Sequence, residues 1–256
     1  MKNAIKTENK KNGSITAYLL AVFFFFLGWD ILSHILNNPA LPEPLPAITQ
    51  FFYIFPHTLW KHFLISSYRV VTSLLIGILL AVPLGLYVGR NEKIDHFFAP
   101  LIYLLYPIPK IALLPVIFII FKIGDASKIF LITLIIFFQI LVTTRDAAKK
   151  VPTASIISVL SLGASDWEIY KHVIIPACLP EIFTSIRISL GTAISVLFFA
   201  ESFATFQGLG YFIFETWSRI SYQEMFAGIL ALSLLGSILF LLVDVLQRLL
   251  CPWLYV

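Results

Sequence analysis

The residues of this chain that are able to do chemistry are single charged side chains inside long apolar runs. Lys110 lies midway along one run, directly after Pro107 and Pro109. Glu201 lies near the end of another run. A charge at the centre of a bilayer costs about 3 kcal/mol or more unless it faces a cavity or a partner. We therefore expect the two charged residues and the two neighbouring prolines on a translocation pathway, with Lys110 attracting an anion. The alternatives are a structural ion pair between Lys110 and Glu201, or a Glu201 exposed at the outer interface.

Two further charges, Arg187 and Asp244, are expected to reach the cytoplasmic interface from within their apolar runs, as long charged side chains can. No enzyme signature accompanies them, because the sequence lacks the GxxxxGK[ST], GxSxG and HExxH patterns. Cys178 and Cys251 are isolated and lack metal-ligand spacing. The sequence therefore predicts no catalytic residues, no metal site and no cofactor bound by this chain. The energy for active transport must come from a partner.

A polar stretch, 145–180, lies between two apolar runs and is expected outside the bilayer. After Pro152, apolar residues recur at helical spacing over 156–160, and Gly163 is suited to end that helix. A short helix with such a stripe predicts a docking surface for a soluble partner. The spacing is equally compatible with an ordinary cytoplasmic loop helix that rests on the membrane surface.

Composition indicates the elements that must position these residues. Of the 256 residues, 59% are hydrophobic and 12% are charged, about half the charged share of a soluble domain. We expect an all-α integral membrane protein with about six transmembrane helices, because each apolar run approaches the length needed to cross a bilayer. A cytoplasmic tail, 1–14, precedes a single transmembrane domain, 15–256. The expected spans are 15–36, 70–88, 97–121, 129–142, 182–204 and 225–250.

Prolines and aromatic residues modify this plan. Segment 37–46 holds four prolines and is expected to be non-helical. Segment 48–63 is aromatic and amphipathic, which predicts a separate helix along the outer surface. The span 97–121 is interrupted by prolines at 107, 109 and 115. Irregular backbone at membrane depth must be buried in protein or line a cavity, so this span is expected to face the interior of the assembly.

Lysine and arginine residues predict the orientation. If the N-terminus is cytoplasmic, most of them fall in cytoplasmic segments, including the polar stretch 145–180. That distribution follows the positive-inside rule. The sequence therefore predicts a multi-pass membrane protein with both termini in the cytoplasm.

One motif in the stretch 145–180 carries a family resemblance. Gly163 is followed by ASDWEIYKH and then by VIIP at 173–176. This spacing resembles the cytoplasmic EAA loop of ABC importer permeases, and SLGASDWEIYKHVIIPACLP is similar to the nitrate, sulfonate and taurine branch. The resemblance extends from residue 68 to the C-terminus, with a core at 68–250. The sequence departs from the family at 157–159, where Ile-Ser-Val replaces Glu-Ala-Ala and removes an acidic residue that helps to anchor the ATPase.

The resemblance implies a type I ABC importer permease fold in the plasma (inner) membrane. It implies a homodimer surrounded by membrane lipid, two cytoplasmic ATP-binding cassette subunits that carry ATP and Mg, and an extracytoplasmic substrate-binding protein. No nucleic acid is involved. Closure of the ATPases would switch the pathway to outward-open, and the solute would be a small anion such as a sulfonate, taurine or nitrate. The residues expected to couple to the ATPase are Ile156, Ile157, Val159, Leu160, Gly163, Ala164 and Ser165. The alternative function is a membrane-embedded enzyme, or an anchor that holds a soluble partner through its loop.

Overall fold

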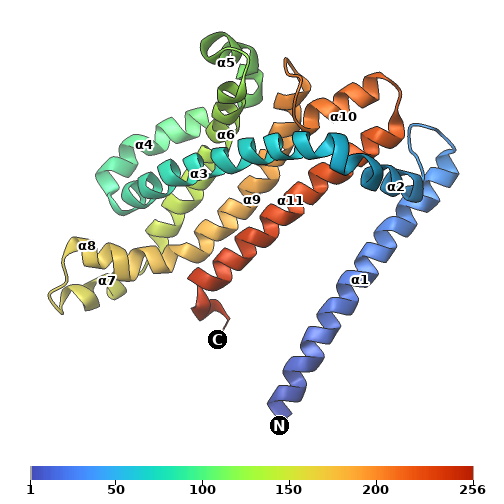
Figure 1. The fold of residues 1–256 in the computed structure, drawn as a ribbon. Coiled ribbons are helices and arrows are strands. Elements are labelled where there is room, and N and C mark those ends of the chain that lie inside the picture. The colour runs from blue at the N-terminus through green and yellow to red at the C-terminus, as the bar shows by residue number, and fades with distance from the viewer. Residues whose placement is uncertain (1, 256) are drawn as a thin grey trace.

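The computed structural model describes the backbone of residues 2–255, and the side chains from residue 16 onward apart from residue 18. Every regular element in this range is helical (Figure 1). The long helices are α1 (Lys2–Leu36), α3 (Trp60–Arg90), α6 (Asp125–Lys150), α9 (Ile175–Ser202) and α11 (Tyr222–Leu250). The shorter helices are α2 (Pro44–Ile54), α4 (Glu92–Leu105), α5 (Leu114–Phe121), α7 (Thr153–Leu160), α8 (Asp166–Ile169) and α10 (Leu209–Ser218). The predicted all-α fold is confirmed.

The described chain holds 5 helical segments long and apolar enough to cross a membrane, or up to 6 if α4 and Lys110–Phe121 form one bent span. The unbent segments are Leu19–Leu36, Pro44–Arg90, Asp125–Lys150, Asp166–Ser202 and Tyr222–Leu250. The expectation of about six spans therefore agrees with the larger count. Most observed helices are longer than the predicted apolar runs, because polar residues at their ends continue the helical backbone.

The N-terminal third differs from the expected boundaries. Helix α1 begins at Lys2, within the segment expected to be a tail, although its apolar window begins at Leu19. Helix α2 begins at Pro44, so the expectation that all of 37–46 is non-helical is wrong at its end. Proline is tolerated there because the first residues of a helix have no intrahelical partner for their N–H groups.

The helix expected at 48–63 is present, but it is not separate from the following span. Helix α2 continues through a wide π-helical turn, Phe55–Leu59, directly into α3. Pro56 lies in this turn and lacks an N–H donor. A local widening of the helix accommodates such a residue without ending the helical path. The segment Pro44–Arg90 is consequently one helical run with a local distortion.

The proline-interrupted span is broken as expected. Helix α4 ends at Leu105, a tight helical turn follows at Lys110–Leu113, and α5 begins at Leu114. The two helical parts meet at 76°. Pro107 and Pro109 lie in the break, where each removes a backbone donor and fixes φ. The break leaves carbonyl groups without helical partners, which becomes important for Lys110.

Helices α3, α6 and α9 form the centre of the bundle, where α3 and α6 approach closely. A Cβ added to Gly89 would lie 2.3 Å from the carbonyl oxygen of Arg145, and one added to Gly85 would lie 2.8 Å from Thr144 Cβ. Only glycine permits this spacing between the backbones. The close contact fixes α3 against α6 over the half of the molecule that leads toward α7.

Helix α10 covers the end of the bundle opposite α7 and α8 (Figure 1). It lies within the segment 205–224, between α9 and α11, and buries Leu209, Gly210 and Phe212. Helix α1 lies apart from the centre of the bundle (Figure 1) and stacks Trp29 on Phe226 of α11 with the ring centroids 5.3 Å apart.

Candidate functional site

Helices α7 and α8 project from one end of the bundle, beyond the ends of α6 and α9 (Figure 1). No residue of α7 is buried. The side chains of Ile157 and Leu160 are 58% and 53% exposed, whereas Ile156 packs against the core. Leu162 and Trp167 are also largely exposed. Part of the predicted apolar stripe is therefore presented on the surface, and Trp167 extends it beyond the residues that helical spacing indicated.

A chain reversal between α7 and α8 is fixed by backbone geometry. Gly163 has φ +86°, in the left-handed region that favours glycine. Its N–H donates to Leu160 O at 3.0 Å, and the N–H of Ala164 donates to Val159 O at 3.4 Å. These two bonds form a Schellman motif, so the expected capping role of Gly163 is confirmed. Ser165 then starts α8 in a capping box with Glu168.

Most of the polar stretch 145–180 is helical. Helix α6 continues to Lys150, and the helical path resumes at Asp166 and runs into α9. Arg145 and Lys149 both pair with Asp95 at the start of α4. The basic residues of this stretch therefore hold α4 against α6, in addition to any role in membrane orientation.

Lys110 lies in the break between α4 and α5 and lines a cavity of about 340 Å³ together with residues of α6 and α9, among them Gln139 and Ser195. Its Nζ donates to the carbonyl oxygens of Tyr106 and Leu105 at 2.9 and 3.1 Å, and lies 4.7 Å from the ring centroid of Phe138. The carbonyls released by the broken helix thus satisfy part of the ammonium group. Nζ reaches no carboxylate among the described residues, so the expected alternative of a Lys110–Glu201 ion pair is wrong.

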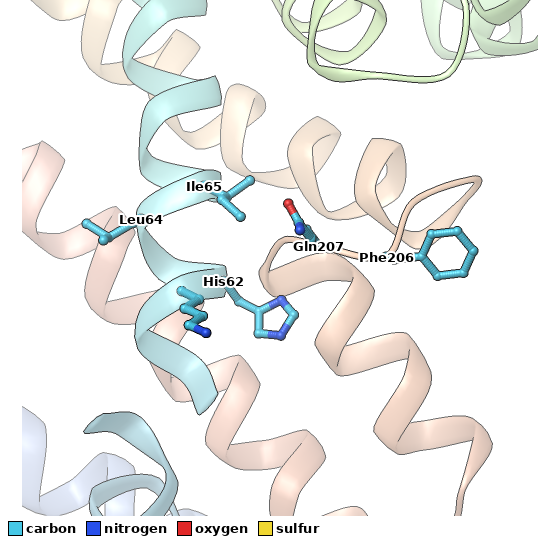
Figure 2. A pocket seen from close by; sticks show the side chains of 6 residues that line it. His62, Leu64, Ile65, Phe206 and Gln207 are labelled. Carbon is cyan, nitrogen blue, oxygen red and sulfur yellow. The ribbon is translucent and has the colours of Figure 1, made fainter. Parts of the chain in front are cut away.

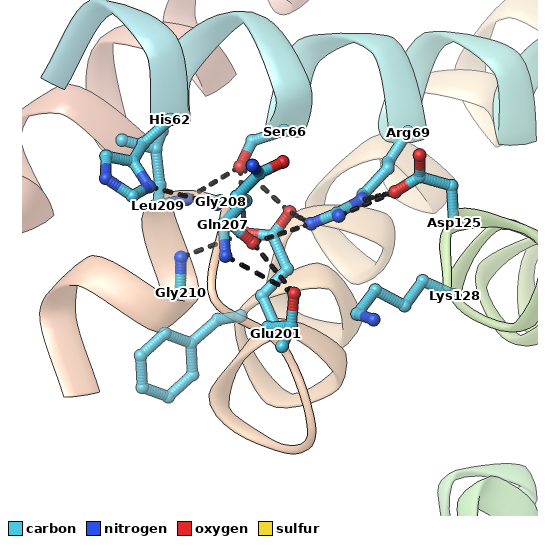
Figure 3. A network of polar contacts seen from close by, with 12 residues as sticks. His62, Ser66, Arg69, Asp125, Lys128, Glu201, Gln207, Gly208, Leu209 and Gly210 are labelled. Carbon is cyan, nitrogen blue, oxygen red and sulfur yellow. Dashed lines mark hydrogen bonds and ion pairs between the residues drawn. The ribbon is translucent and has the colours of Figure 1, made fainter. Parts of the chain in front are cut away.

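Glu201 is instead fully buried, and the expectation of exposure at an interface is wrong. Its Oε1 accepts from Arg69 Nη1 at 2.7 Å, and its Oε2 accepts from the N–H of Gly210 at 2.9 Å (Figure 3). Ser66 Oγ lies 2.9 and 2.8 Å from the two carboxylate oxygens. A carboxylate with its charge paired and both oxygens hydrogen-bonded can be buried at tolerable cost.

Arg69 is the residue that sequence reasoning missed, since it was placed only at the edge of a span. Besides Glu201, it donates to Asp125 Oδ1 at 2.6 Å and to the carbonyl oxygen of Gln207 at 3.0 Å (Figure 3). One guanidinium therefore joins α3 to the start of α6, to the end of α9 and to the loop before α10. The sequence contained one indication of such a partner: Glu201 lies among apolar residues, and an acid in such surroundings requires a cation.

Arg187 and Asp244, both expected to reach the cytoplasmic interface, contact each other in the structure. Arg187 Nη2 donates to Asp244 Oδ1 at 2.6 Å and to Gln247 Oε1 at 2.5 Å. The pair joins α9 to α11, so it contributes to packing between helices. Cys178 and Cys251 are free thiols and both are buried.

This chain is similar in sequence to a known protein family. Residues 73–255 match the family model described as binding-protein-dependent transport system inner membrane component. The taurine transport system permease protein TauC of Escherichia coli (strain K12) is 33% identical over 232 residues, covering 88% of this chain and 84% of that protein. The putative aliphatic sulfonates transport permease protein SsuC of Bacillus subtilis (strain 168) is 28% identical over 252 residues, covering 97% and 91%.

A solved structure supports the fold. An inward-facing structure of the MetNI methionine ABC transporter contains a chain that aligns with a TM-score of 0.65 and 22% identity, covering 75% of this chain and 95% of that chain. The family model covers more than half of the chain, and the structural match shows the fold. The chain therefore belongs to the family of binding-protein-dependent transport system inner membrane components, the permease subunits of ABC importers.

Proposed function

We propose that this chain pairs with a second copy to form the translocation pathway for a small organic anion of the sulfonate or taurine type. It is a non-catalytic permease subunit of an ABC importer, and ATP is bound by a separate ATPase subunit. The alternative of a membrane-embedded enzyme is therefore set aside. The relatives named for taurine and for aliphatic sulfonates support a solute that carries a sulfonate group, which is anionic even in the zwitterion taurine.

The observation that carries the proposal is the position of Lys110. It is a cation in the break of an apolar span, beside a cavity of about 340 Å³ lined by three helical segments. Its contacts are neutral carbonyl groups and an aromatic ring, so its charge is not cancelled by an acid among the described residues. In a homodimer, two such lysines near the axis would create a positive zone that attracts oxoanions and repels cations. Pro107 and Pro109 keep the backbone open there.

The projecting α7–α8 segment is proposed as the surface that couples to the ATPase. Ile157 and Leu160 supply exposed apolar contacts in place of the missing acidic residue, and Gly163 fixes the reversal that presents them. Ala164 and Ser165 complete the cap and start α8. In the proposed orientation, α7, α8 and both termini lie in the cytoplasm. An extracytoplasmic binding protein would then deliver solute at the α10 end.

The experiment uses the permease with its ATPase and binding protein in proteoliposomes, with uptake of radiolabelled ethanesulfonate, a simple anion, and ATP hydrolysis measured in parallel. Lys110→Met should reduce uptake roughly tenfold or more, because charge in a focused pathway raises local anion concentration by such factors. ATP hydrolysis stimulated by the binding protein should remain. Lys110→Arg should retain most uptake, and Lys122→Met should match the wild type as a control on an exposed outer lysine. Normal uptake by Lys110→Met would refute the pathway role.

A further inference from the structure

A second pocket lies at the other end of α3 from the α7–α8 segment, between the start of α3 and the loop before α10. It has a volume of about 440 Å³ and is lined by Lys61, His62, Leu64, Ile65, Phe206 and Gln207. Figure 2 shows the ring of His62 and the side chains of Gln207 and Phe206 around this space. The volume falls in the range of sites for small organic molecules, which is about 300–1,000 Å³. Apolar and polar groups thus meet in one hollow of suitable size.

The polar side of this pocket consists of hydrogen-bond donors. Nδ1 of His62 accepts the backbone N–H of Gly208 at 3.0 Å. In the neutral imidazole the proton must then reside on Nε2, so the free ring atom is a donor. Lys61 has neither a hydrogen bond nor an ion pair among the described residues, and its ammonium group is available. The side-chain amide of Gln207 likewise has no partner within residues 2–255 and can donate through Nε2.

The acid that interacts with His62 does not neutralise these donors. Glu215 is the acid on α10 that interacts electrostatically with His62. Its Oε1 is held 2.7 Å from Arg219 Nε, which offsets its charge. The lining residues themselves contain one cation and no carboxylate. A ligand that matches the pocket therefore carries an anionic group with several acceptor oxygens.

The loop before α10, which forms one wall of this pocket, is held rigidly by hydrogen bonds to buried groups. The Arg69–Glu201 pair described above fixes the carbonyl oxygen of Gln207 and the N–H of Gly210, while Ser66 accepts the N–H of Leu209 at 2.8 Å (Figure 3). Together with the bond from Gly208 to His62, four successive residues are anchored to buried groups. Such preorganisation reduces the entropy lost on binding. Phe206, which is 85% exposed, lies on the apolar side of the pocket.

We propose that this outer pocket binds an oxoanion that carries a short apolar group, with the oxygens on Lys61, His62 and Gln207 and the apolar group against Phe206 and Ile65. The identification of that oxoanion as the transported solute rests on the proposed function. The same chemistry is present in the headgroup of an anionic lipid. As a solute site, the pocket would receive the anion on the outer side before it reaches Lys110.

The test measures binding of butanesulfonate to the permease–ATPase complex in nanodiscs of phosphatidylcholine, by saturation-transfer difference NMR without nucleotide or binding protein. Lys61→Met and Gln207→Leu should each weaken binding, the former roughly tenfold, as expected for loss of one hydrogen bond to a charged group. Lys122→Met should bind as the wild type does. Butylammonium, which has the same chain and the opposite charge, should give no saturable signal.

Two further arms separate the possible outcomes. The loss of binding caused by Lys61→Met should be as large in a Lys110→Met background as in the wild type, so the outer pocket can be confirmed even if Lys110 proves unimportant for uptake. In a second arm, phosphatidylglycerol replaces part of the phosphatidylcholine. If butanesulfonate binding then falls only in discs whose protein retains Lys61, the ligand of the pocket is a lipid headgroup. Unchanged affinity in both Lys61→Met and Gln207→Leu, or equal binding of butylammonium, would overturn the proposal.

Discussion

Removing Arg69 should destabilise the protein far more than neutralising Glu201. The side chain of Arg69 is 4% exposed and that of Glu201 is 0% exposed, whereas Asp125, the other partner of Arg69, is 52% exposed. Arg69→Met leaves a fully buried carboxylate whose remaining contacts are the neutral Ser66 and Gly210. Breaking a buried pair in this way costs about 3–5 kcal/mol. Glu201→Gln keeps the shape of the side chain and leaves Arg69 paired with Asp125, so we expect a loss of about 1–2 kcal/mol.

Thermal retention in detergent, followed by fluorescence-detected size-exclusion chromatography, measures this difference. At 2–4 °C per kcal/mol, a scale for soluble domains of similar length, Arg69→Met should lower the transition by roughly 6–20 °C. The double variant Arg69→Met with Glu201→Met should recover a large part of that loss, because it no longer buries an unpaired charge. Arg187→Met serves as a control, since its partner Asp244 is 45% exposed and can be hydrated. Equal losses for Arg69→Met and Glu201→Gln, or no recovery in the double variant, would refute the reasoning.

Three other predictions concern α7–α8, the outer loop and topology. Gly163→Val should insert and assemble but lose ATPase stimulation by the binding protein, because φ +86° disfavours a β-branched side chain by about 1–2 kcal/mol. Gly28→Ala, with nothing within 4 Å of its Cβ, is the control, and normal stimulation of Gly163→Val would contradict the coupling role. Gly208→Ala should cost about 3 kcal/mol in thermal retention, since its Cβ would lie 2.3 Å from Glu201 Cδ at φ +114°, and wild-type retention would show that the loop can move. A phosphatase reporter fused after Tyr255 should be inactive and a green fluorescent reporter active, and the opposite result would reverse the proposed orientation.

The sequence alone determined the features that depend on local chemistry. Apolar runs of sufficient length predict membrane helices whatever their position in the bundle, since the thickness of the bilayer sets the same length requirement for each. Pro107 and Pro109 break a helix because they lack donors, and Gly163 ends one because it tolerates positive φ. These properties belong to individual residues and their near neighbours, so the broken span and the cap after α7 were predicted correctly. Helix ends were less certain, as Pro44 and Pro56 show, because proline is compatible with both a first turn and a widened turn.

Only the tertiary structure decided which buried charges are partners. Glu201 pairs with Arg69, 132 residues away, and Arg187 pairs with Asp244, 57 residues away. Sequence spacing carries no information about such pairs, because the choice depends on which helix faces meet and at what depth. Lys110 illustrates the same limit, since the carbonyls that hold it come from its own broken helix while its cavity is lined by α6 and α9. The cost of an unpaired charge in an apolar interior required that partners exist, and the packing of the helices determined which residues they are.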